Sequence, residues 1–566
     1  KDDEQMSTHR HQGIIKPQRR GWGRVSLVAM ASAALLLGAC GGGGSGGSSG
    51  SQTAGAGDEG TPQSGGTVIY ALESETNSGW CLQEAQLAIS GIQVARAIYD
   101  TLVQPDESGE MQPMLAESVE PNATFDSWTI KIRPGITFHD GSKLDAKVVA
   151  NNLNAYRGKY KARSPLLFVF VLENIATVEA TDDMTVTVTT KTPWPSFPNF
   201  LWNDGRLGIV GQAQLDDAKG CDKNLVGTGP FVKKEWKIND HFTATKNPDY
   251  WQKDADGTQL PYLDEIEFRP QPEPSQRTEG IQTGTYDAAH VQGGDALIES
   301  QSLADAGAVN LIANSDFAEV SYLLFNVAKA PFNNADARMA VAQALNREEA
   351  NQLLSKGQQK VASGPFAPGS MGYLADAGLP AFDLKAAKTH VAAYEKATGK
   401  KLSFLVPFFG NAEAQATLEL YQSQLAEAGI ELKLQPTEQS AEIDRAIAGD
   451  FGALLWRNHP GGDPDLQYVW WQSESPVNFG KFADPEIDKL LNEGRENADP
   501  AERTKIYEEL NRRFGSELYN VWTAWVKWGV VSAPKVHGIL GPDVDGKPPF
   551  PGLATGHPVS GMWVDG

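Results

Sequence analysis

Cys40 is the residue whose surroundings indicate a definite chemistry. It ends the run Leu-Leu-Leu-Gly-Ala-Cys over 35–40, and four glycines follow it directly. Basic residues between 16 and 24 and an apolar stretch over 25–39 precede it, which is the charged, apolar and small-residue order of an export signal. Residues 37–40 look like a lipobox, in which the thiol takes a diacylglycerol and the preceding segment is cut off. We therefore expect a signal peptide over 1–39 and a lipidated Cys40, with an incidental cysteine after an ordinary secretory signal as the alternative.

The length of the apolar stretch favours a lipid anchor over a spanning helix. About 15 residues fall short of the roughly 20 that cross a bilayer. Two acyl chains, palmitate among them, give lasting attachment where one chain does not, because each buried methylene contributes about 0.8 kcal/mol. We expect the protein on the extracellular face of the cell membrane or in the periplasm.

The composition excludes several classes of partner. The chain has 566 residues and a net charge of −22, and removal of 1–39 leaves 43 basic against 68 acidic residues. Such a surface repels phosphate backbones and anionic headgroups, so we expect no nucleic-acid partner and no direct headgroup binding. Solubility is the plainer explanation of the charge. Residues 40–65 form a Gly/Ser/Thr linker that has no means of burying a core.

Cys81 and Cys221 are the two cysteines that remain beside Cys40. In an oxidising compartment an even pair indicates a disulfide, with two isolated buried thiols as the alternative. The sequence contains no Cys-x-x-Cys and no His/Cys cluster with zinc spacing, so we expect no metal and no cofactor.

The elements that must position any site alternate irregularly between strands and helices. This mixture predicts α/β or α+β lobes and argues against a sandwich or a helical bundle. The patterns indicate strands at 66–71, 128–132, 185–189, 321–327 and 520–526, and helices at 85–102, 335–350, 383–397, 412–428 and 500–516.

Two of these strands suggest where the chain divides. If the strands at 321–327 and 520–526 are crossings between lobes, the segment between them is one inserted lobe. We then expect lobe I over 66–315, including a small domain at about 100–200, lobe II over 316–520, and a return to lobe I over 521–566.

Six ordered motifs resemble those of one known family, the extracellular solute-binding proteins of peptide/nickel-type ABC importers, family 5. The likeness extends from about residue 66 to about residue 531. The motifs are Ile-Arg-Pro-Gly-Ile-Thr-Phe-His-Asp-Gly at 132–141, Val-Gly-Thr-Gly-Pro-Phe at 226–231, Asn-Pro-Asp-Tyr-Trp at 247–251, Phe-Asn to Asn-Arg at 325–347, Asp-Pro-Asp at 463–465 and Asp-Pro-Glu-Ile-Asp-Lys-Leu at 484–490.

The resemblance implies a fold and a function. The fold would be a two-lobed, three-domain α/β clamp with a hinge, like the type II (cluster C) periplasmic binding proteins. A monomer would capture a small solute, with a short peptide as the first candidate, and deliver it to a membrane permease driven by cytoplasmic ATPases. The same clamp with a metal chelate, a sugar or an opine is the nearest alternative. An exported hydrolase is less favoured, because no nucleophile stands in a Gly-x-Ser-x-Gly context and no catalytic residue emerges.

Residues 454–464, an apolar strand that enters a Gly/Pro loop, form the first candidate for the ligand site. They offer Trp456, Arg457, Asn458 and Asp463. In peptide-binding relatives the aspartate of this motif pairs with the ligand's α-ammonium, and Asp463 matches it. The alternative is that Asp463 caps the following turn or helix. Arg457 would receive a ligand carboxylate or pair internally with Asp463.

Residues 75–81 form the second candidate, because relatives line one cleft wall with this loop. Asn77 and Trp80 are its candidate ligand-binding residues, and extended peptides can bind such a wall through main-chain hydrogen bonds. Trp80 departs from the usual sequence of the family at this loop, and its indole would either narrow the pocket or belong to the core. The tryptophans at 194, 202, 522, 525 and 528 are expected in core or interlobe packing.

Overall fold

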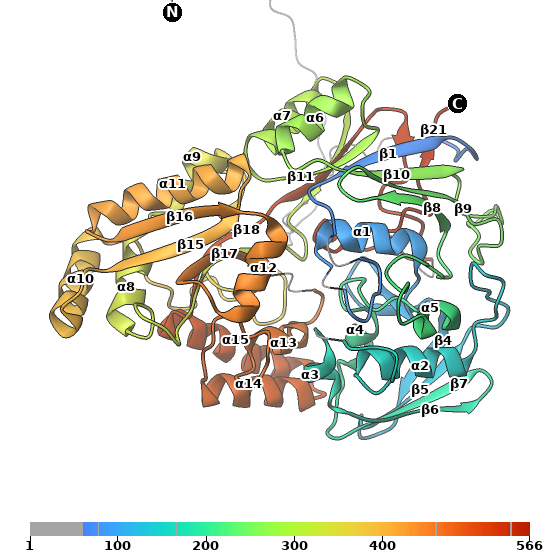
Figure 1. Cartoon of the computed structure of the whole chain (residues 1–566), viewed down its shortest axis with the longest axis horizontal. Coiled ribbons are helices and arrows are strands. Elements are labelled where there is room, and N and C mark those ends of the chain that lie inside the picture. Colours follow the sequence, from blue (N-terminus) through green and yellow to red (C-terminus); the bar gives the residue numbers. More distant parts are fainter. Residues whose placement is uncertain (1–59, 77–78, 86, 166, 459–460, 544–545) are drawn as a thin grey trace, which may run out of the picture. The chain divides into compact units, whose positions relative to one another are not determined.

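The computed structural model describes residues 60–76, 79–85, 87–165, 167–458, 461–543 and 546–566 (Figure 1). The expected signal peptide, Cys40 and most of the 40–65 linker lie outside these residues. Within them, no helix combines the length and the apolar composition that a crossing of a lipid bilayer demands.

The first described strand, β1, belongs to a seven-stranded mixed sheet. Its central strand β1 is parallel to both β10 and β11 and is buried on both faces, because Tyr70 belongs to the apolar cluster that includes α1, and Ala71 to the cluster that includes α6 and α7. These helices lie on opposite sides of the sheet in Figure 1. The elements are β12 (Asn310–Asn314), β19 (Trp528–Ser532), β11 (Ala288–Gln292), β1 (Thr67–Leu72), β10 (Glu265–Pro270), β9 (His241–Lys246) and β8 (Phe231–Lys237), in spatial order, with α1 (Ile89–Ile98), α6 (Pro274–Gln282) and α7 (Gly294–Asp305).

A four-stranded antiparallel sheet follows α1 in the chain. Its strands alternate buried and partly exposed residues, as half-buried strands do, and α2 packs on it. Asp145 caps α2 by accepting a hydrogen bond from the Val148 N–H at 2.9 Å. The elements are β4 (Ala116–Pro121), β5 (Ser127–Ile132), β7 (Thr185–Thr190) and β6 (Ile175–Asp182), in spatial order, with β2 (Val103–Pro105), β3 (Met111–Pro113), α2 (Ala146–Tyr156), α3 (Val169–Leu172), α4 (Phe197–Trp202) and α5 (Gln212–Asp216).

A second four-stranded antiparallel sheet and a parallel strand pair are built from residues 320–525. A separate apolar cluster lies between them and helices α8, α10 and α11. The elements are β14 (Lys360–Val361), β18 (Asn520–Trp525), β13 (Val320–Phe325) and β17 (Ala453–Asn458), in spatial order, then the pair β15 (Ser403–Phe409) and β16 (Glu431–Thr437), with α8 (Ala335–Ala344), α9 (Arg347–Ser355), α10 (Leu384–Thr398), α11 (Ala412–Glu427) and α12 (Gln439–Ala448).

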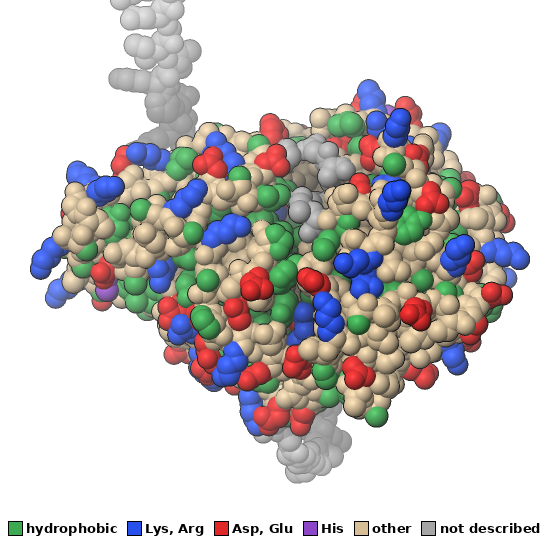
Figure 2. Space-filling model, turned by 60° about the horizontal axis from the view of Figure 1, so that its bottom comes forward, with side chains coloured by type: hydrophobic (Ala, Val, Ile, Leu, Met, Phe, Trp, Pro, Cys, Tyr) green, Lys and Arg blue, Asp and Glu red, His purple; other side chains and the backbone are tan. Residues whose placement is uncertain are grey.

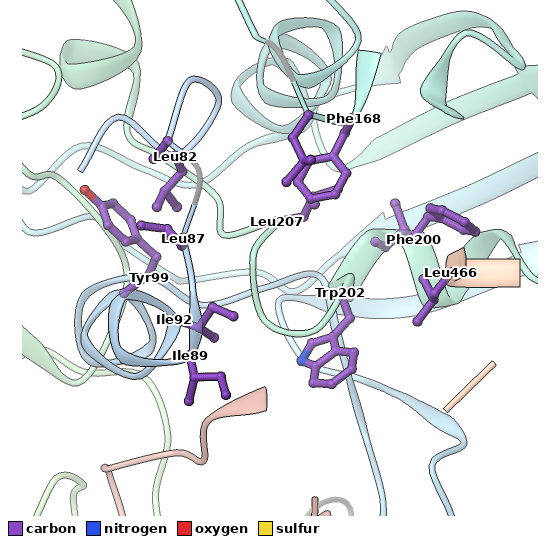
Figure 3. Close-up of a cluster of buried hydrophobic side chains, with 14 of the residues drawn as sticks. Leu82, Leu87, Ile89, Ile92, Tyr99, Phe168, Phe200, Trp202, Leu207 and Leu466 are labelled. Atoms are coloured by element: carbon purple, nitrogen blue, oxygen red, sulfur yellow. The ribbon is translucent and has the colours of Figure 1, made fainter. Parts of the chain in front are cut away.

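The remaining elements join these sheets. In Figure 3, Leu466 of η1 lies beside Phe200 of α4, so residues far apart in sequence share one core with Ile89 and Ile92 of α1. Acidic and basic side chains are interspersed over the face shown in Figure 2. The elements are η1 (Pro464–Gln467), α13 (Tyr468–Trp471), α14 (Pro485–Glu496), α15 (Pro500–Glu517), β20 (Val536–His537), η2 (Leu553–Thr555) and β21 (Trp563–Val564).

The chain passes twice between the seven-stranded sheet and the sheet of β13. Residues 315–319 lead from β12 to β13, and residues 526–527 lead from β18 to β19. The two passages are adjacent, because the Val526 N–H donates to the Glu319 carbonyl at 2.8 Å. The division into lobes at 315 and 520 stays a prediction.

The expected strands and most of the expected helices are present within a few residues of their expected bounds. The helix expected at 335–350 is wrong as a single element, because Leu345 and Asn346 separate α8 from α9. The Asn346 side chain accepts a hydrogen bond from the Glu349 N–H at 3.1 Å and so caps a new helix. The helix expected at 85–102 is shorter, at Ile89–Ile98.

Cys81 and Cys221 are joined in a disulfide, as expected. The bond connects the loop before α1 to the segment after α5, across 140 residues of sequence. Arg163 donates to the Cys81 sulfur at 2.9 Å and to the Asp217 carbonyl at 2.7 Å, so its guanidinium contacts both connected segments.

Candidate functional site

A cavity of about 570 Å³ lies between the seven-stranded sheet and the sheet of β13. Its volume is in the range of sites for small molecules. One wall comes from the segment after β1, the end of β11 and the starts of α6 and α7. The other comes from β13, β17, β18, α9, α11, α12 and the end of β15.

The charged residues that line this cavity are mostly acidic. Among the described lining residues, six carry carboxylates and two carry guanidiniums, with neither lysine nor histidine. The cavity therefore favours a positively charged group over a negatively charged one. The lining charged residues are Glu73, Glu273, Asp295, Glu319, Glu413 and Glu442, with Arg347 and Arg457.

Arg457 of β17 is the central cation of the cavity. Its Nη2 lies 2.9 Å from Glu73 Oε1, and its Nη1 lies 3.7 Å from Glu319 Oε2 and donates to Gln292 Oε1 at 2.7 Å. Because Glu73 follows β1 and Gln292 ends β11, the arginine of one sheet is held by groups of the other. The contacts therefore connect both walls of the cavity.

Burial and charge shift the pKa values of these groups in opposite directions. Burial alone would lower the pKa of Arg457, but Glu319, Glu73 and Glu413 outweigh it and raise that pKa. For Glu73, burial favours the neutral acid, yet Arg457 and Arg277 hold the pKa below its usual value. Burial raises the pKa of Glu319 and Glu413 despite Arg457. One arginine therefore does not compensate all the carboxyl groups around it.

Arg347, the second lining cation, is committed to backbone carbonyls. It begins α9, and its Nη1 donates to the carbonyls of Ala362 at 2.8 Å and Trp522 at 3.0 Å. Its Nη2 donates to the Pro380 carbonyl at 3.3 Å. Both arginines among the described lining residues are thus occupied by protein groups.

The structure brings two of the expected ligand-site residues to the cavity. Trp456 and Arg457 line it, and the Trp456 ring stands edge-on to Phe479 with centroids 5.4 Å apart. The alternative in which Arg457 pairs with Asp463 is wrong, because Arg457 pairs with Glu73 and Glu319.

Asp463 does not line the cavity. Its two carboxylate oxygens accept hydrogen bonds from Arg503 of α15 at 2.6 and 2.8 Å, and Oδ1 also caps η1 through the Asp465 N–H at 2.9 Å. The capping alternative is therefore present in the structure, together with an ion pair that the sequence did not indicate.

Trp80 and Asn458 are also placed away from the cavity lining. Trp80 is 1% exposed and packs against Trp236 and Phe242. Asn458 is buried and donates to Gln467 Oε1 at 3.0 Å. Asn77 lies outside the described residues. The expected core positions at 194, 202, 522, 525 and 528 are all buried tryptophans.

Sequence reasoning missed the acidic wall, which consists of the six lining carboxyl groups from both sides of the cavity. Glu73 directly follows an apolar strand and Gln292 directly precedes two glycines, which are signals of a strand end. Nothing in the sequence separates Glu319, Glu413 and Glu442 from the chain's other acidic residues. Among the described residues, no group of three or more His, Cys, Asp or Glu side chains has a geometry that would hold a metal ion.

Comparisons with known proteins define the class of protein. The fold is that of the periplasmic binding proteins. The family described as bacterial extracellular solute-binding proteins, family 5 Middle, matches residues 110–479. Because the match covers more than half of the chain, the protein belongs to this family. The family and its relatives are solute-binding proteins of ABC importers, not enzymes.

Several relatives illustrate the family. The glutathione-binding protein GsiB of Pectobacterium atrosepticum is 25% identical over 473 residues, covering 79% of this chain and 86% of its own. The oligopeptide-binding protein AppA of Bacillus subtilis is 26% identical over 528 residues, covering 88% of this chain and 92% of its own. Its structure with a nonapeptide gives a TM-score of 0.77 over 89% of this chain and 100% of that one. The structure of AgaA of A. tumefaciens R10 with agropinic acid is 25% identical in sequence. Its TM-score is 0.77 over 88% of this chain and 99% of that one.

Proposed function

We propose that this protein is the lipid-anchored receptor of an ABC importer that captures short peptides and delivers them to its permease. The observation that carries the peptide proposal is the acidic cavity between the two sheets. A peptide brings an α-ammonium, which a desolvated carboxylate binds in a strong charge-assisted hydrogen bond. The names of GsiB and AppA, which bind glutathione and oligopeptides, agree with a peptide cargo.

An anionic cargo fits the charges less well. Agropinic acid, the ligand of AgaA, is a carboxylic acid. In the described lining, Arg347 and Arg457 are already bound by carbonyls and carboxylates. An anionic solute would have to displace one of these contacts and approach the remaining carboxylates. A peptide can leave its carboxylate at the solvent end while its ammonium enters the acidic wall.

Filling the cavity tests the site. Ala416 is an exposed residue of α11 that lines the cavity, whereas Ala426 is exposed on the same helix outside the lining. Titration calorimetry with the tripeptide Ala-Ala-Ala should show affinity reduced at least tenfold in Ala416→Trp and unchanged in Ala426→Trp. Equal binding by both variants would place the ligand elsewhere.

Mass spectrometry of the solutes that co-purify with the protein should identify peptides, and opines or sugars alone would overturn the peptide proposal.

The lipid anchor has its own test. In cells grown with labelled palmitate, the protein should carry the label and fractionate with the membrane. Cys40→Ser should abolish labelling and release the protein from the membrane fraction. Labelling of Cys40→Ser at the wild-type level would contradict the anchor without affecting the cargo proposal.

A further inference from the structure

Among the described lining residues, Glu442 is the acidic residue whose carboxyl group has a buried oxygen without a hydrogen-bond partner. It lies on α12, is 6% exposed, and its Oε2 accepts a hydrogen bond from the Phe409 N–H at 3.0 Å. Its Oε1 is buried and has no hydrogen-bond partner among the described residues. A buried carboxylate oxygen without a partner costs free energy, so its presence in a binding cavity calls for an explanation.

The neighbouring groups do not supply the missing cation. Arg457 is held by Glu73, Gln292 and Glu319, and its charge acts on Glu442 without an ion pair between them. Lys481 and the other lysines of the described residues do not line the cavity. Among the described residues, no cation is therefore placed to pair with Glu442, which leaves its carboxyl group available to a ligand.

We propose that the cavity selects cationic cargo, such as a peptide with a lysine or arginine side chain, and that Glu442 binds its ammonium or guanidinium group. This inference rests on the proposed function and specifies its substrate class. Glu413 on α11 and Glu73 lie in the same cavity and add to the attraction. A peptide's α-ammonium and its basic side chain then occupy two parts of one acidic wall.

The protonation of Glu442 agrees with this assignment. Burial raises its pKa to about 8, while the Phe409 N–H and Arg457 oppose the shift. Without a cation the carboxyl therefore keeps its proton at neutral pH, which explains how the folded protein tolerates it. A bound cation favours the ionised form and converts the group into a strong acceptor.

Two matched tripeptides and two matched variants test the inference. Ala-Lys-Ala and Ala-Nle-Ala differ by the side-chain ammonium, because norleucine has a similar chain without charge. Glu442→Gln keeps the shape and the acceptor for Phe409, and Asp444→Asn removes an exposed carboxylate from the same helix. Calorimetry at pH 7.5 should show that the wild-type protein binds Ala-Lys-Ala at least tenfold more tightly than Ala-Nle-Ala. Glu442→Gln should bring the two affinities within twofold, and Asp444→Asn should keep the preference.

The other outcomes separate the two proposals. Equal binding of both tripeptides by wild type would overturn the cationic inference and leave peptide capture standing. A preference that survives in Glu442→Gln would overturn the role of Glu442. The wild-type protein could instead bind 1,5-diaminopentane and neither tripeptide, with this binding lost in Glu442→Gln. That result would support the cationic site and refute peptide cargo. Binding of none of the three probes would overturn the inference.

Discussion

Two charged residues of one short stretch have different roles at the residue scale. Arg457 is the second-last residue of β17 and lines the cavity, and Asp463, six residues later, is held by Arg503 outside the lining. The Asp463 and Arg503 side chains are 12% and 9% exposed, so the pair is largely removed from water. The structure therefore gives Asp463 a structural partner where the family resemblance suggested a ligand.

Removal of the Asp463 carboxylate should destabilise the protein and spare its ligand affinity. Asp463→Ala leaves the buried Arg503 without its partner, and such a loss typically costs about 3–5 kcal/mol. Urea unfolding should show the decrease, while calorimetry on the folded variant should show affinity within about twofold of wild type. Glu502→Ala, which breaks an exposed pair with Lys505, is the control and should cost less than about 1 kcal/mol. Lost affinity at unchanged stability would restore Asp463 to the ligand site.

At the element scale, local patterns were sufficient for strands and insufficient for the site. Apolar runs and alternation located β1, β5, β7, β13 and β18, because burial on one or both faces determines those residues directly. The break between α8 and α9 was missed, because it depends on one Asn cap inside an apolar pattern that continues across it. The acidic wall was missed because its members lie after β1, before β13, at the starts of α6 and α7, and on α11 and α12, which only tertiary contacts bring together. The cysteine pair was found because so few partners were available.

The disulfide should contribute substantially to stability, because it joins elements that are distant in sequence. Closing a loop of 140 residues restricts the unfolded chain, and native disulfides of this kind contribute about 2–5 kcal/mol. The double variant Cys81→Ser/Cys221→Ser should lower the free energy of unfolding by that amount. Its ligand affinity should be retained, because neither cysteine lines the cavity. Two free thiols in the oxidised wild-type protein, counted under denaturing conditions, would contradict the bond.

At the scale of the whole molecule, a pair of buried histidines lies where the seven-stranded sheet packs on the C-terminal segment. His290 of β11 stands edge-on to Tyr70 and Trp528, and neither of its ring nitrogens has a hydrogen-bond partner among the described residues. His557 contacts the Tyr70 hydroxyl at 2.9 Å, and its ring lies 6.0 Å from that of His290. Both rings are essentially unexposed. A proton on either ring would be a buried charge without compensation.

This arrangement predicts a loss of stability in acid. Burial, aided by Arg277, lowers the pKa of His290 to about 3, against 6.5 for the ordinary group. Below pH 6.5 the unfolded state therefore binds a proton at His290 that the folded state does not bind. The contribution of neutral His290 to the free energy of unfolding is fully present above pH 6.5 and decreases as the pH falls toward 3. At pH 4 this one residue should cost about 3 kcal/mol relative to pH 7. His290→Phe keeps an aromatic ring of similar size and cannot titrate, so urea unfolding between pH 7 and pH 4 should show a shallower decline by about that amount. An equally steep decline in the variant would assign the acid sensitivity to the ion-paired carboxylates instead.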